Sequence, residues 1–301
     1  MSMLLFMTGF AVLSVLCTVW CLGAKRPPFL THKQPRDSVT AGLVPVVVYS
    51  VLLRWRRVLR AQVIHVGQWL FRYRDSMFPL ALVVMAAVTK PVFPLGSERV
   101  DHWLDGLGLM VALLGQGCRL LAVGSVHNIR RGGRNKHFAA KELIQDGFFA
   151  HTRNPLYLGN LLIAAGLVLI ADSPAWFLVV LPLTVGMYCA IVLAEETFLT
   201  ARFGQTYLDY CQRVGRFLPT LTGLRASLSV NGIDWRRALW KEARIFCAWG
   251  SFVVGLLVWK QWEMFGFAAR RGEIVALALA WVITLGIASG GGWWLKNTTQ
   301  P

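Results

Sequence analysis

Charged residues are scarce in this sequence. Asp, Glu, Lys and Arg make up 15% of the 301 residues, whereas soluble globular chains contain about 25%. Hydrophobic residues reach 55%, and the mean hydropathy is +0.52. A chain this apolar cannot hide its hydrophobic surface in one water-soluble core. The composition therefore excludes a soluble enzyme and a disordered tail protein, and it favours a membrane protein.

Acidic residues are especially few. The chain has 15 Asp and Glu against 31 Lys and Arg, so its net charge is +16. Such an excess often marks a nucleic-acid-binding protein, but here the basic residues lie between long apolar stretches. Attraction to anionic lipid headgroups on one membrane face explains that placement better. We therefore expect the lipid bilayer, and no nucleic acid, as a partner.

The six cysteines lack any C-x-x-C pair, any Cys/His cluster and any spacing typical of a disulfide framework. Five of them lie in apolar stretches, and only Cys211 lies in a polar one. The sequence thus excludes a secreted disulfide scaffold, and it predicts no metal site.

Seven stretches are long and apolar enough to be read as transmembrane helices, which need about 20 residues. They are residues 3–23, 77–96, 106–126, 155–171, 173–194, 245–259 and 274–295. The joint at Asp172 is so short that the spans on either side must form an antiparallel hairpin. The predicted fold class is all-α, a polytopic helical membrane protein with about seven transmembrane helices. Residues 39–53 are also uncharged but contain Pro45, so a span, an interfacial helix and a re-entrant helix all remain open there.

The connections between these spans predict the orientation of the protein. Residues 24–76, 127–154 and 195–244 hold the largest excess of Lys and Arg, and seven spans place all three on one side. The positive-inside rule makes that side cytoplasmic. The chain is therefore expected to cross the membrane several times, with its N-terminus outside and a cofactor pocket on the cytoplasmic face.

Two polar motifs bracket the hairpin and resemble those of the isoprenylcysteine carboxyl methyltransferase and phospholipid methyltransferase families. The matching positions are Gly147, Arg153, Asn154, Pro155, Tyr157 and Gly159 before the hairpin, and Glu195, Glu196, Leu199, Phe203, Gly204, Tyr207, Tyr210, Arg216 and Pro219 after it. Members of these families are integral membrane enzymes that use S-adenosylmethionine. The resemblance covers residues 104–219, and it divides the chain into an N-terminal membrane region (1–103), a methyltransferase core (104–219) and a C-terminal linker with two helices (220–301).

The resemblance also implies which residues bind the cofactor. Carried over position by position, they are Lys141, Glu142, Leu143, Ile144, Phe149, Asn154, Pro155, Leu156, Tyr157, Glu195 and Glu196. The sequence departs from the prenylcysteine enzymes at three positions, where those enzymes usually have Tyr for Phe149, His for Asn154 and Arg for Ile191. An apolar residue at 191 favours contact with an apolar part of the acceptor over contact with a carboxylate.

The residue types agree with this assignment. Pro155 is suited to the first turn of a helix and biases Asn154 toward extended geometry. That arrangement would leave backbone N–H groups and the Asn154 amide free to bind a ligand at the positive helix end. Glu195 lies where a span ends and could accept hydrogen bonds from ribose hydroxyls or a cationic amino group. Arg119 lies inside a span, where a charge is a functional candidate by default, and it joins Arg153 as a candidate catalytic residue.

Three functions are compatible with these patterns. The first is methyl transfer from S-adenosylmethionine to a lipophilic acceptor, such as a prenylcysteine-type carboxylate or a lipid. The second is an NADPH-dependent membrane oxidoreductase of the steroid-reductase kind, whose Asp-Glu-x-Arg-Cys stretch is replaced here by Glu195-Glu196-Thr197-Phe198. The third is a non-catalytic membrane scaffold. The sequence leaves the acceptor and the oligomeric state open.

Overall fold

The computed structural model describes residues 43–126, 138, 140, 142–227 and 232–297. Within these ranges every regular element is helical. The elements are α2 (Leu43–Val88), η1 (Pro94–Gly96), α3 (Glu98–Gly124), η2 (Gly147–Ala150), α4 (Pro155–Ile170), η3 (Trp176–Val180), α5 (Leu181–Phe203), α6 (Gln205–Arg213), α7 (Leu224–Ser227), α8 (Trp235–Phe265) and α9 (Phe267–Asn297). The predicted all-α fold class is therefore confirmed for the described part of the chain.

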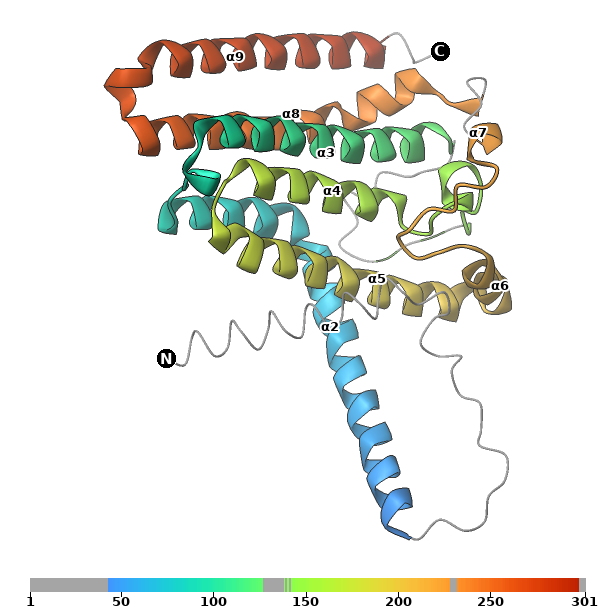
Figure 1. The fold of residues 1–301 in the computed structure, drawn as a ribbon. Helices are drawn as coiled ribbons and strands as arrows, with labels where there is room; N and C mark the ends of the chain where they lie inside the picture. The colour runs from blue at the N-terminus through green and yellow to red at the C-terminus, as the bar shows by residue number, and fades with distance from the viewer. Residues whose placement is uncertain (1–42, 127–137, 139, 141, 228–231, 298–301) are drawn as a thin grey trace.

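The long helices α3, α4, α5, α8 and α9 lie roughly side by side, with α4 between α3 and α5 (Figure 1). The N-terminal part of α2 extends away from them, whereas its C-terminal part packs against α5. Helices α6 and α7 lie at one end of the bundle, which we call the motif end. The α8–α9 connection lies at the other end, which we call the opposite end.

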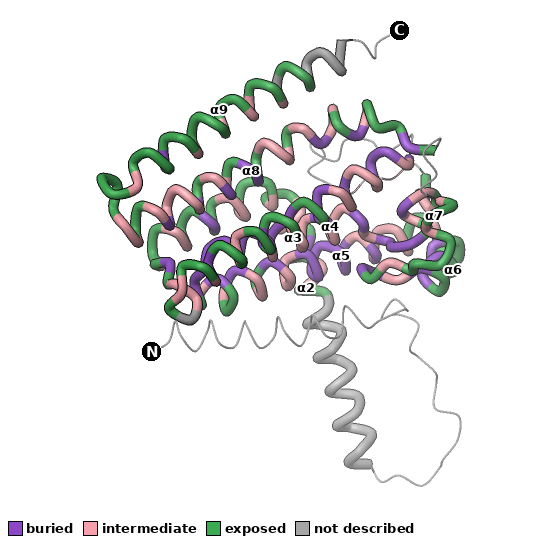
Figure 2. The backbone as a smooth tube through the Cα atoms, turned by 45° about the horizontal axis from the view of Figure 1, so that its top comes forward, coloured by how far each residue is buried: buried purple, intermediate pink, exposed green. Residues whose placement is uncertain are grey.

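Helix α4 lies deepest in the bundle because its 16 residues carry no charge and pack closely against α3. Two pairs of glycines allow the approach. A Cβ atom added to Gly108 would lie 2.7 Å from the carbonyl oxygen of Gly166, and one added to Gly115 would lie 2.5 Å from that of Gly159. Small residues at such contacts are typical of helix packing in membranes. Figure 2 shows the buried residues concentrated on these central helices, while α9 is mostly exposed.

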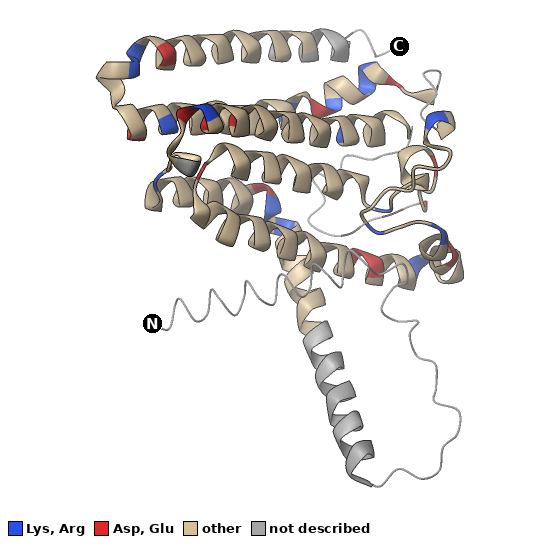
Figure 3. Cartoon of the chain, viewed as in Figure 1, with Lys and Arg blue, Asp and Glu red and all other residues tan. Residues whose placement is uncertain are grey.

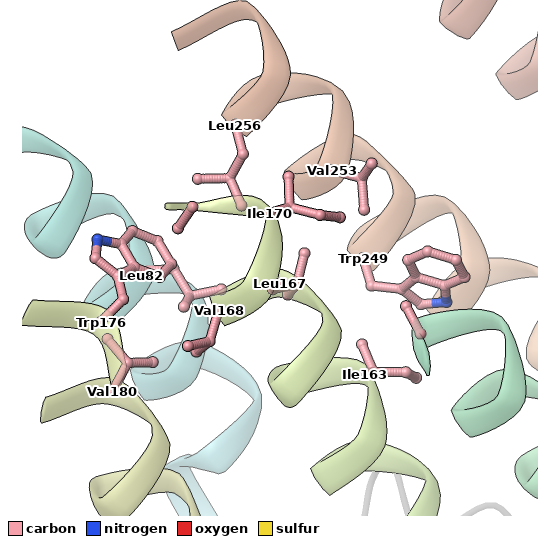
Figure 4. Close-up of a cluster of buried hydrophobic side chains, with 12 residues drawn as sticks. Leu82, Ile163, Leu167, Val168, Ile170, Trp176, Val180, Trp249, Val253 and Leu256 are labelled. Carbon is pink, nitrogen blue, oxygen red and sulfur yellow. The ribbon is translucent and has the colours of Figure 1, made fainter. Parts of the chain in front are cut away.

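The hydrophobic core joins the predicted methyltransferase region to helices on both sides of it in sequence. Leu167 and Val168 of α4 meet Leu82 of α2 and Val253 of α8 in one buried cluster (Figure 4). Trp176 of η3 is fully buried in the same cluster. Charged side chains gather mainly near the two ends of α3 and α8 and at the start of α9, and leave the middle of these helices apolar (Figure 3).

Four of the described helices are long and apolar enough to cross a membrane: Glu98–Gly124, Trp176–Phe203, Trp235–Phe265 and Phe267–Ala288. They contain the apolar stretches predicted at 106–126, 173–194, 245–259 and 274–295, apart from a few terminal residues. Pro155–Ile170 is apolar but shorter. The hairpin that turns at Asp172 is confirmed, and Asp172 adopts a left-handed backbone conformation with φ 44°.

The stretch 77–96 differs from the prediction. It is not a separate helix, because α2 runs without interruption from Leu43 to Val88 and the chain then leaves the helical conformation. The charges at Arg72, Arg74 and Asp75 mark a change in hydropathy but do not interrupt helical hydrogen bonding, and Pro79 is accommodated within the helix. Residues 43–53 also belong to α2, whereas the span predicted at 3–23 lies outside the described residues. The total of seven spans stays a prediction.

Candidate functional site

The segments before and after the hairpin are joined by backbone hydrogen bonds at the motif end. Arg153 N donates to Gly215 O at 2.9 Å, and Thr220 N donates to His151 O at 2.9 Å. Thr152 and Gly215 form a parallel bridge. The hairpin returns the chain to the same end of the bundle, so the two motifs meet as the sequence predicts.

A buried ion-pair triad lies directly behind this junction. Glu196 accepts two hydrogen bonds from Arg216, at 2.9 Å from Nε and 2.8 Å from Nη2, and its Oε1 lies 3.1 Å from Arg153 Nη1. All three side chains are at least 98% buried. Both carboxylate oxygens of Glu196 are thus engaged by arginines, which is the arrangement of a structural link between the two motifs.

Cys211 completes the surroundings of Arg153, because Arg153 Nη1 also contacts its Sγ. Burial raises the pKa of the Cys211 thiol, even though the neighbouring Arg153 acts in the opposite direction. The thiol therefore stays protonated at neutral pH, and Cys211 is not equipped to act as a thiolate nucleophile.

Asn154 does not keep the free amide that its position before Pro155 suggests. Its Nδ2 donates to the carbonyl oxygen of Arg216 at 3.0 Å. The expectation of an unengaged amide is therefore wrong, because the second motif folds back and supplies an acceptor that sequence spacing does not reveal. Asn154 still precedes the first turn of α4, with Pro155 as the first helical residue.

Glu195 lies on a different face of α5 from Glu196 and meets the first motif through a side chain. Tyr157 donates its hydroxyl proton to Glu195 Oε2 at 2.9 Å. The Tyr157 ring packs against Tyr188, with the ring centroids 5.4 Å apart. The structure thus brings together Tyr157 and Glu195, two of the predicted cofactor-binding residues, between α4 and α5.

Arg119 is buried within the bundle, where it joins three helices. Its guanidinium forms two hydrogen bonds with Glu242 of α8, at 2.7 and 2.9 Å, and donates to Asn160 Oδ1 of α4 at 2.8 Å. A weaker bond reaches the carbonyl oxygen of Leu156 at 3.5 Å. The charge inside a predicted span is therefore neutralised by a carboxylate from α8, a partner that lies outside the motif region.

The remaining predicted residues are distributed around these contacts. Lys141 lies outside the described residues. Glu142 is exposed, Leu143, Ile144, Phe149 and Leu156 are half-buried, and Pro155 and Ile191 are buried. The carbonyl oxygen of Phe149 accepts a hydrogen bond from Tyr210 at 2.7 Å, which ties the first motif to α6. Ile191 is fully covered by neighbouring side chains, so its contact with an acceptor stays a prediction.

Sequence reasoning missed one residue of this region, Arg74 of α2. It interacts electrostatically with Tyr157, Glu195 and Tyr188. Because it lies just before the apolar stretch 77–96, the sequence assigned it to the basic cytoplasmic connection 24–76. The available signal was a cation directly before the apolar C-terminal part of a helix, and its partners became visible only in the fold.

Two pockets lie near the motifs. One of about 460 Å³ is lined by Leu143, Asp146, His151, Tyr210, Arg213 and neighbouring residues. The other, of about 380 Å³, lies between α2 and α5 and is lined by His65, Gln68, Trp69, Phe71, Arg72, Phe138 and Phe198. Both volumes are within the range of about 300–1,000 Å³ that is usual for small-molecule sites.

The second pocket is connected to the Tyr157–Glu195 pair through Phe198 of α5. Phe198 follows Glu195 by three residues on α5, so the two side chains are neighbours on one helix face. On α2, the Arg74 guanidinium lies 4.0 Å from the centre of the Phe71 ring. The pocket therefore has an aromatic wall in which Phe71 contacts the Arg74 guanidinium and Phe198 follows Glu195 by one helical turn.

Comparisons with known proteins find relatives of the segment that carries the two motifs. Residues 105–206 match the phospholipid methyltransferase family. The chain is 28% identical over 130 residues to a protein-S-isoprenylcysteine O-methyltransferase of Tribolium castaneum, covering 41% of this chain and 44% of that protein. It is 29% identical over 128 residues to the enzyme of that name from Rattus norvegicus, covering 42% and 45%. No solved structure matches the chain significantly.

These matches confirm the resemblance of the central segment to the two methyltransferase families, and they do not favour the reductase alternative. The matched part spans less than half the length of each curated relative. Together with the four membrane-capable helices, they define an integral membrane protein that carries a phospholipid-methyltransferase-type segment.

Proposed function

We propose that this protein is an integral membrane methyltransferase that moves a methyl group from S-adenosylmethionine to a lipophilic acceptor. The observation that carries the proposal is the pairing of Tyr157 with Glu195 within the segment that matches the phospholipid methyltransferase family, one helical turn before Phe198 of an aromatic pocket. The isoprenylcysteine methyltransferases among its relatives make a prenylcysteine-type carboxylate or another lipid the acceptor class to test first.

The residues present fit such a cofactor. Phe71, Phe138 and Phe198 provide flat apolar surfaces for an adenine ring, and Glu195 provides an acceptor for ribose hydroxyls or an ammonium group. When bound, the cofactor would supply an activated sulfonium methyl. The protein's own contribution would be to orient the reactants and exclude water, because charge is dispersed rather than created in this displacement. We assign Glu196 and Arg153 to holding the two motifs together rather than to direct contact with the cofactor.

Glu195→Gln is expected to weaken the binding of S-adenosylmethionine at least about tenfold, or about 1.4 kcal/mol. The reason is that the carboxylate is replaced by a neutral amide at the pocket edge, while the side-chain volume hardly changes. Equilibrium binding of radiolabelled S-adenosylmethionine to the purified protein in detergent measures the effect. An unchanged dissociation constant in a folded variant would remove Glu195 from the site.

We further propose that the motif end faces the cytoplasm, where S-adenosylmethionine is available. The excess of Lys and Arg in residues 127–154 and 195–244 supports this orientation. An acceptor dissolved in the bilayer could then reach the site laterally, between helices.

A topology measurement tests this orientation. In intact cells, a cysteine introduced at Ser97, at the opposite end, is expected to react with a membrane-impermeant thiol reagent. A cysteine at the exposed Thr222, at the motif end, is expected to react only after the cells are permeabilised. The reverse pattern would overturn the proposed orientation.

A further inference from the structure

Arg74 is a half-buried cation, and part of its hydrogen-bonding capacity is not used by any residue that the structure describes. Its side chain is 18% exposed, and its Nη1 is buried without a hydrogen-bond partner among the described residues. A guanidinium nitrogen enclosed in this way carries a desolvation cost that a hydrogen-bond acceptor would remove. An anionic group that approached this nitrogen would supply the missing acceptor.

The neighbouring acidic residue on α2 does not fill that role. Asp75 Oδ1 approaches Arg74 Nε only to 3.5 Å, and the Asp75 side chain is 73% exposed. A surface carboxylate of this kind contributes little to the stability of an ion pair. It also approaches Nε and leaves Nη1 unpaired.

A second acidic residue, Glu195 of α5, interacts with Arg74 without an observed hydrogen bond between the two side chains. Glu195 interacts electrostatically with Arg74, yet its Oε2 is hydrogen-bonded to Tyr157 instead. Phe71, which lies under the Arg74 guanidinium, and Phe198, one turn beyond Glu195, both line the 380 Å³ pocket. The Arg74 guanidinium thus contacts one residue that lines this pocket, and Glu195 precedes another by one helical turn.

We propose that Arg74 and Glu195 together bind the zwitterionic amino-acid end of the methyl donor, Arg74 its carboxylate and Glu195 its ammonium group. A guanidinium binds a carboxylate through paired N–H donors, and a carboxylate accepts from an ammonium group. The assignment rests on the proposed function, since it takes S-adenosylmethionine as the ligand. It extends the donor site to α2, which lies outside the segment that matches the methyltransferase family.

The test compares two ligands that differ only in the group that Arg74 would bind. S-Adenosylmethionine and its decarboxylated analogue share the sulfonium, the adenosine and the ammonium group, but only the former has a carboxylate. We expect the wild-type protein in detergent to bind S-adenosylmethionine at least about tenfold more tightly than the analogue. Arg74→Met should abolish most of that preference and leave binding of the analogue nearly unchanged, and Arg74→Lys should retain part of it.

Lys90→Met provides the matched control, because it removes one positive charge from an 83% exposed side chain beyond the end of α2. It should bind both ligands as the wild type does. Equal weakening of both ligands by Arg74→Met would indicate a structural role and overturn the proposal. If that variant does not fold, a wild-type protein that binds both ligands equally would overturn it as well.

The outcomes separate the two proposals. A wild-type protein that binds S-adenosylmethionine while Arg74→Met retains full affinity would refute the role of Arg74 and leave the methyltransferase proposal intact. A folded wild-type protein that binds neither ligand would refute both.

Discussion

Glu196→Gln is expected to destabilise the protein by about 3–5 kcal/mol, because it removes the one carboxylate that neutralises two buried arginines. Arg153 and Arg216 are enclosed at the junction of the two motifs, and the glutamine amide can neither balance their charge nor accept as many hydrogen bonds. Unfolding of the purified protein in detergent, followed by circular dichroism, should show the loss as a lower transition midpoint.

Glu195→Gln is the matched control, since it makes the same chemical change one residue earlier on α5. Its side chain is half-buried and faces Tyr157 rather than an arginine pair, so its transition midpoint should stay close to that of the wild type. Equal destabilisation by the two substitutions would contradict the assignment of Glu196 to structure and Glu195 to binding.

Lys260→Met is expected to have a comparably large effect at the opposite end of the bundle. Lys260 Nζ lies 2.7 Å from a carboxylate oxygen of Asp101 and 2.7 Å from one of Asp105, and it also pairs with Asp172. Its side chain is 98% buried. Removing this ammonium group would leave three clustered carboxylates without a cation, which should cost about 3–5 kcal/mol at neutral pH.

The loss should depend on pH in a defined direction. Burial raises the pKa of Asp172 to about 7, although Lys260 opposes the shift. A carboxyl with a raised pKa binds its proton more tightly in the folded state. Its stabilising contribution is complete below the unfolded pKa of about 3.9 and is lost as the pH rises through about 7.

Lys260 is the positive charge that favours ionised Asp172, and the Met variant lacks it. Lys260→Met should therefore be least stable at pH 8, where Asp172 is ionised, and should recover markedly at pH 5, where Asp172 is protonated. Transition midpoints measured across this range, with the exposed Lys90→Met as control, test the expectation. If Lys260→Met lowered the transition midpoint by the same amount at pH 5 and at pH 8, repulsion between the carboxylates would be ruled out as the cause.

These contacts also give the C-terminal helices a structural role. Glu242 near the start of α8 pairs with Arg119, and Lys260 near its end pairs with Asp101 and Asp105. Helix α8 is therefore attached to α3 by buried ion pairs at both ends, and its Val253 joins the hydrophobic core between them. The helix that follows the motif region thus supports the segment that carries the proposed site.

Several features of this protein were determined by the sequence alone. Long uncharged stretches indicate membrane-spanning segments, and hydrocarbon offers no hydrogen-bond partners to their backbone. A helix pairs the backbone N–H and C=O groups of such a stretch within the stretch itself. For that reason the helical fold class, the hairpin at Asp172 and the meeting of the two motifs could be predicted. The motifs also placed Tyr157 and Glu195 among the predicted cofactor residues, and the fold brings these two side chains together, while their contact with a cofactor stays a prediction.

Only the tertiary structure decided which polar groups neutralise one another. Nothing in the local sequence distinguishes Glu195 from Glu196, yet one faces a tyrosine and the other two arginines, because adjacent residues on a helix point in different directions. The partners of Arg119, Lys260 and Arg74 lie on helices far away in sequence. Ion pairs and binding sites of this kind depend on how helices pack, and hydropathy and spacing along one chain do not contain that information.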